Sequence, residues 1–74
     1  MGRGTTIANE IERLIARLDG ARVCDDCITD QLNLSVRSQA NVVTRALGTE
    51  RDYDREKEAC ALCARTKTVI RRAG

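Results

Sequence analysis

The sequence predicts a small α+β fold in which three helices are followed by a β-hairpin. Apolar residues recur at helical spacing in three segments of the first two thirds of the chain. The last third instead holds two runs that favour extended backbone, with a Cys-x-x-Cys turn between them. Tyr53 is the only aromatic among 74 residues, so the core of this single domain is small and needs an additional staple.

The first helix is predicted over Thr5–Leu18. Its apolar residues recur every three or four positions, as in an amphipathic helix: Ile7, Ile11, Leu14, Ile15 and Leu18. Thr5 or Thr6 caps its start, and Gly20 stands where a left-handed residue is expected to end it.

A second, shorter helix is predicted over Cys24–Leu32, after a short extended piece at residues 21–23. Asp25 or Asp26 supports its positive N-terminal end. Asn33 interrupts the helix, and because Asn adopts the left-handed conformation more readily than most residues, it predicts a sharp corner.

The third helix is predicted to begin at a capping Ser35, to run to about Leu47 and to end at Gly48. Its apolar stripe consists of Val36, Ala40, Val43 and Leu47. The opposite face carries Ser38, Asn41 and Arg45, with Arg37, Gln39 and Thr44 alongside.

The hairpin is predicted from strands at Tyr53–Ala59 and Thr66–Arg72, with Cys60–Cys63 in the turn. We expect residues 1–74 to form one domain with flexible ends at about 1–4 and 73–74.

Four cysteines form two Cys-x-x-Cys pairs, Cys24/Cys27 and Cys60/Cys63, with 32 residues between them. Two such pairs supply the four thiolates that a structural zinc ion takes, so we expect one Zn²⁺ to join the start of the second helix to the hairpin tip. The alternatives are two disulfides or a redox switch, and buried cysteines that form neither a disulfide nor a metal site. A catalytic zinc is not expected, because sulfur fills all four positions. Ala64 follows the second pair where such turns often have Gly, which counts against a standard zinc knuckle, because an alanine in a left-handed conformation would cost about 1 kcal/mol.

The segment Leu32-Asn33-Leu34-Ser35 resembles the Leu-Gly-Leu-Ser corner in the helix-turn-helix of bacterial regulators. The whole chain, over residues 5–72, is similar to a group of small, zinc-containing bacterial proteins that add two Cys-x-x-Cys pairs to a winged helix-turn-helix. The resemblance implies a three-helix winged helix with the hairpin as its wing, and a role as a DNA-binding transcriptional regulator.

The residue types of the third helix agree with double-stranded DNA as the partner. A helix in the major groove must present short polar side chains and arginines, and the expected contacts come from Arg37, Ser38, Gln39, Asn41 and Arg45. In the wing, the residues expected to meet phosphates are Arg55, Lys57, Arg65 and Lys67. The basic excess also lies in residues 33–74, where nine Lys and Arg face five acidic residues.

Other partners stay open at this point. A polar outer face suits a protein-interaction module equally well, and Glu56 and Glu58 would repel phosphates. RNA or ribosome association is a third alternative, although the aromatic side chains that stack on unpaired bases are missing. A lone domain this small buries limited contact area, so a homodimer through the first helix or the last strand is an open arrangement.

The sequence does not favour an enzyme or a membrane protein. Histidine is absent, and no nucleophile–base pair or Gly-rich phosphate loop is present, so we expect neither an enzyme nor a small-molecule substrate. No apolar run is long enough for a membrane span, and residues 1–10 lack a secretory h-region. We therefore expect a cytoplasmic protein without membrane partners.

Overall fold

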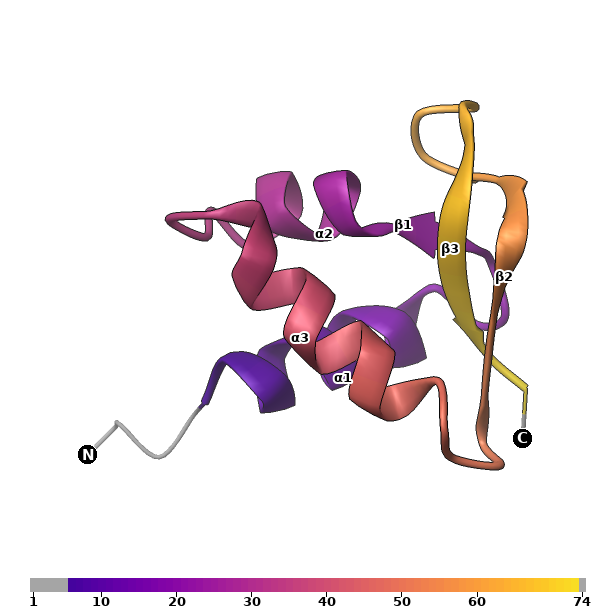
Figure 1. Cartoon of the computed structure of the whole chain (residues 1–74), viewed down its shortest axis with the longest axis horizontal. Helices are drawn as coiled ribbons and strands as arrows, with labels where there is room; N and C mark the ends of the chain where they lie inside the picture. Colours follow the sequence, from indigo (N-terminus) through magenta and orange to yellow (C-terminus); the bar gives the residue numbers. More distant parts are fainter. Residues whose placement is uncertain (1–5, 74) are drawn as a thin grey trace.

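The protein is described by a computed structural model over residues 6–73, and it has the predicted α+β winged helix-turn-helix fold (Figure 1). The elements follow in the order α1 (Ile7–Arg17), β1 (Val23–Cys24), α2 (Asp25–Gln31), α3 (Arg37–Leu47), β2 (Tyr53–Ala59) and β3 (Thr66–Arg72). Both predicted strands have the predicted bounds, and the helices begin or end within two residues of prediction.

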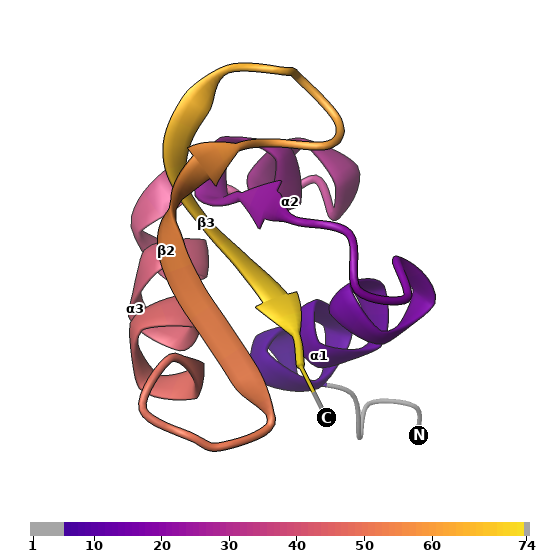
Figure 2. The same ribbon diagram turned by 90° about the vertical axis from the view of Figure 1, so that its right-hand side faces the viewer.

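The three strands form one antiparallel sheet in the order β1-β3-β2. The long hairpin stands beside α3, and the short β1 brings the start of α2 against the middle of β3 (Figure 2). This arrangement makes β2 and β3 the wing, whose tip lies at the end of the molecule where α2 is found (Figure 1).

The core lies between α1, the helix-turn-helix and the inner face of the sheet. Its buried apolar residues are Ile11, Leu14, Ile15, Val23, Cys24, Ile28, Ala40, Leu47, Cys60, Val69 and Ile70. None of them is aromatic, and two of the four cysteines belong to the set. The metal-ligand candidates are therefore also part of the packed interior.

The two predicted left-handed corners are confirmed. Gly20 has φ 92° after α1, and Asn33 has φ 55° between α2 and α3. Thr6 caps α1, since its hydroxyl accepts a hydrogen bond from the Asn9 N–H at 3.1 Å. The alternative cap, Thr5, lies outside the described residues, as do the predicted flexible positions 1–4 and 74. Ala73 is tied down by its N–H, which donates to the Asp52 carbonyl at 2.7 Å.

The start of α3 differs from the prediction. Val36, and not Ser35, is the N-cap residue, and Gln39 Oε1 accepts from the Val36 N–H at 3.5 Å. At this position the Val36 side chain is 52% exposed, so its assignment to the apolar stripe is wrong. The buried stripe of α3 is instead Ala40, Thr44 and Leu47, and it includes a polar residue.

That polar residue is satisfied by Asp25, the first residue of α2. The Thr44 hydroxyl donates to Asp25 Oδ1 at 2.7 Å, and the Asn41 side-chain amide donates to Oδ2 at 2.9 Å. Asp25 is 4% exposed, so its carboxylate is desolvated and depends on these two donors. The pair of hydrogen bonds sets the position of α3 against α2.

We predict that Asp25→Asn lowers the free energy of unfolding by about 1–3 kcal/mol, because the amide keeps one acceptor oxygen for two buried donors and loses the charge that strengthens both hydrogen bonds. The matched control is Asp26→Asn at the neighbouring position, whose carboxylate is 43% exposed and whose ion pairs contribute less than about 1 kcal/mol. Denaturant unfolding of both variants measures the difference. Equal stability of the two variants would contradict the anchoring role of Asp25.

Candidate metal centre and the surface beside it

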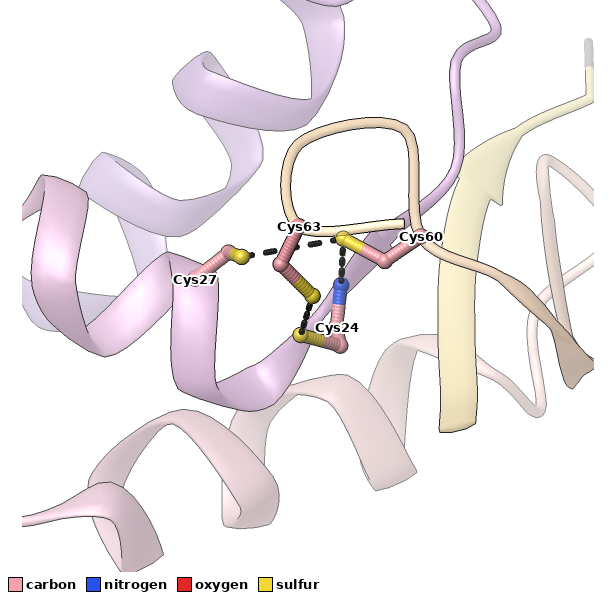
Figure 3. A group of neighbouring side chains, drawn as sticks. All are labelled: Cys24, Cys27, Cys60 and Cys63. Atoms are coloured by element: carbon pink, nitrogen blue, oxygen red, sulfur yellow. Dashed lines mark hydrogen bonds between the residues drawn. The ribbon is translucent and has the colours of Figure 1, made fainter. Parts of the chain in front are cut away.

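The four cysteines come together from two parts of the chain (Figure 3). Cys24 lies in β1 directly before α2, and Cys27 lies in the first turn of that helix. Cys60 and Cys63 lie in the turn between β2 and β3, as predicted. The cluster therefore joins the helix-turn-helix to the tip of the wing.

The spacing of the sulfurs fits a single tetrahedral cation. All four Sγ atoms lie within 4.8 Å of one another, with Cys27 Sγ 3.6 Å from Cys60 Sγ and Cys24 Sγ 3.8 Å from Cys63 Sγ. Four sulfurs at about 2.3 Å from a zinc ion would be about 3.8 Å apart. A disulfide requires about 2.05 Å, and all four residues are free cysteines. The disulfide alternative therefore does not describe this cluster.

Backbone N–H groups around Cys60 favour its thiolate form. Burial opposes ionisation of Cys60, but the N–H groups of Cys63, Leu62 and Cys24 point at its sulfur and together lower its pKa to about 6. The Sγ lies 3.4 Å from both the Leu62 and the Cys24 nitrogen. Burial raises the pKa of Cys24 and of Cys27. One sulfur of the cluster is thus prepared as an anion by the chain itself, as a metal ligand requires.

The turn that carries the second pair is closed by its own backbone. The Ala64 N–H donates to the Cys60 carbonyl at 2.8 Å, and the Cys60 N–H donates to the Arg65 carbonyl at 2.9 Å. Ala64 has φ 65°, so alanine here adopts the left-handed conformation in which such turns often have Gly. The Ala61 N–H also donates to the Arg22 carbonyl at 2.8 Å, so a backbone bond joins this turn to the residues before β1.

The predicted contact residues of α3 fall into two groups. Ser38 and Arg45 are exposed on its outer face, as expected. Asn41 is half-buried and its amide is bound to Asp25, so its assignment to the outward face is wrong. Gln39 is half-buried beside the Val36 N–H.

Arg37, the first residue of α3, and Lys67 of β3 meet at one carboxylate. Arg37 Nε and Lys67 Nζ both pair with Asp26, which lies between the cysteines of the first pair. The hydrogen bond from Lys67, followed by the attraction of Arg37, lowers the pKa of Asp26. Asp26 thereby holds the start of α3 and the wing side by side.

Charges of opposite sign lie on opposite faces of β2. Alternate residues of a strand share a face, so Arg55 and Lys57 lie on one face and Asp54, Glu56 and Glu58 on the other. The cationic face is the one beside α3, because Arg55 packs over Gly48, where an added Cβ would lie 3.0 Å from the arginine side chain. Arg65 is exposed in the turn next to β3. Glu56 and Glu58 therefore lie on the face of β2 opposite Arg55, where Glu58 is the cross-strand partner of Lys67.

The sequence did not predict that the two acids between Cys24 and Cys27 have different partners. Asp25 turns inward to Thr44, and Asp26 turns outward to two cations. The inward position of Asp25 could have been inferred from Thr44. This residue lies four positions after Ala40 and three before Leu47, on the buried stripe, and a polar residue there requires a buried hydrogen-bond partner.

The comparisons with known proteins give no family assignment: no protein-family model, no curated protein and no solved structure matches this chain. Within residues 6–73, no helix is long and apolar enough to cross a lipid bilayer.

We predict that Ala64→Gly raises the free energy of unfolding by about 0.5–1 kcal/mol, because relief of the left-handed strain exceeds the added chain entropy of glycine. Ala61→Gly, in the same turn but without a positive φ, should instead lower it by a similar amount. Denaturant unfolding of the protein as purified measures both. Destabilisation by Ala64→Gly would contradict the described turn.

Proposed function

We propose that this protein is a zinc-stabilised winged-helix module that binds double-stranded DNA, as a transcriptional regulator and not as an enzyme. The observation that carries the proposal is the juxtaposition of four sulfurs with an acid-free recognition helix and an acid-free wing face. The proposal includes kinship with the small bacterial proteins that combine a winged helix with two Cys-x-x-Cys pairs.

Zinc is supported by the donor set and its geometry. Four sulfur ligands at these spacings suit a tetrahedral d¹⁰ ion, and sulfur at every position leaves no open site for a substrate or water. The ion's role would be structural. It would hold the wing tip to α2, and a small core without aromatic residues gains most from such a link.

The distribution of acidic residues supports DNA as the partner. Residues 31–49, which contain α3, carry two arginines and no acid, and residues 59–74, which contain β3, carry four basic residues and no acid. All eleven acidic residues lie outside these two segments. The face of β2 beside α3 adds Arg55 and Lys57. A phosphate backbone that passed along α3 and this face of β2 would thus meet Arg37, Arg45, Arg55 and Lys57.

Asp26 fixes the positions of two cations on this surface. By pairing with Arg37 and Lys67 it holds both cations at the junction of α3 and the wing, where a DNA strand that crosses from the major groove would pass. Since the carboxylate is 43% exposed, phosphate oxygens can replace it as the partner of either cation.

For the metal, we predict one zinc ion per chain by elemental analysis of the purified protein. Cys27→Ser should reduce the zinc content and lower the free energy of unfolding by about 3 kcal/mol or more, because loss of a structural metal is among the largest single-substitution effects. The control Ala61→Ser adds a hydroxyl inside the second pair and removes no ligand, so it should keep the zinc. A metal-free, fully folded wild-type protein would refute the zinc proposal.

For DNA, we predict that mobility shifts on random-sequence duplexes occur at low salt and weaken steeply as salt rises. Arg45→Ala should cost about 1–3 kcal/mol of binding free energy, whereas Arg17→Ala, which removes the same charge from the exposed side of α1, should change binding little. If no duplex shifts at low salt, the DNA proposal fails, and the hypothesis that this surface binds a protein partner is favoured.

A further inference from the structure

We propose that Val42 contacts the C5-methyl group of thymine in the major groove and makes this protein prefer sites that contain thymine beside guanine. This inference rests on the proposed DNA-binding function and adds the chemistry that its recognition helix reads. It was not expected from the sequence, where the outward face of the third helix was assigned polar residues alone.

The exposure of Val42 is unusual for its place in the fold. Within the described residues, the exposed large hydrophobic side chains are Val36, Val42 and Leu62, and Val42 is the most exposed at 68%. Val36 lies at the N-cap of α3 and Leu62 in the metal-binding turn, whereas Val42 lies in the middle of α3. A β-branched residue lowers helix propensity, and at an exposed position no packing compensates for it. Neither the helix nor the core accounts for a valine here.

The neighbours of Val42 on the outer face define a small set of chemical groups. Ser38 precedes it by four residues and Arg45 follows it by three, so all three lie on one side of the helix, and all are exposed. Asn41 is bound to Asp25 and is not available to read a base. The face therefore offers a hydroxyl, an apolar group and a guanidinium.

The edges of the bases in the major groove match this set. The thymine methyl is the one apolar group displayed there, and guanine O6 and N7 are the usual acceptors for arginine. Val42 and Arg45 are about 4.5 Å apart along the helix axis, between one and two base-pair steps of about 3.4 Å. A thymine would thus lie within about two base pairs of the guanine that Arg45 contacts.

The test removes one methyl group at a time. The zinc-loaded full chain selects duplexes from a random 20-base-pair library, and a selected duplex is then made with thymine or with deoxyuridine. We expect the deoxyuridine duplex to bind about fourfold more weakly, the factor that corresponds to one buried methyl group (about 0.8 kcal/mol).

Two variants assign the effect. Val42→Ala, which keeps helix propensity high, should bind the two duplexes with nearly equal affinity. Arg45→Ala should weaken both duplexes and keep the fourfold ratio. A ratio near one for the wild-type protein, or a ratio that survives in Val42→Ala, would overturn the inference while DNA binding itself stands. Absence of binding to every duplex at low salt would overturn the DNA proposal, and the inference with it.

Discussion

The structure depends on four cysteine sulfurs that cluster between the helical body and the wing. Thirty-two residues lie between the two pairs, and they include the rest of α2, all of α3 and the first strand of the wing. Beside the sulfurs, the hydrogen bond from the Ala61 N–H to the Arg22 carbonyl links the same two regions. The ion pair between Lys67 and Asp26 adds a further contact between the wing and α2. The proposed zinc ion would close this link.

The loop between Cys24 and Cys27 also organises the surface beyond the cluster. Its two acids are adjacent in a helix, so they point in directions about 100° apart. Asp25 reaches inward to Thr44 and Asn41 and places α3, while Asp26 reaches outward to Arg37 and Lys67 and places the cations. The candidate metal cluster, the position of α3 and the placement of Arg37 and Lys67 therefore depend on the same four consecutive residues. In the proposed function, this sharing makes DNA affinity sensitive to the metal.

Much of the fold was predictable because its signals are local. The stripe from Ile7 to Leu18 predicted α1, the β-favouring residues at 66–70 predicted β3, and Asn33 predicted the corner between α2 and α3. The spacing of the cysteines predicted their convergence. The start of α3 and the identity of its buried face were harder to predict. Thr44 is typical of a surface position, and only its hydrogen bond to Asp25 explains why it is buried. For the same reason the sequence placed Asn41 outward, although its side-chain amide is bound to Asp25.

Amide hydrogen exchange of the full chain, before and after removal of metal by a chelator, shows whether one cation holds the helical body to the wing. If one cation holds the body to the wing, amides of α2 and of β3 should lose protection together on chelation, since each element carries or adjoins one of the two cysteine pairs. Retention of full protection in both elements after complete metal removal would contradict the account.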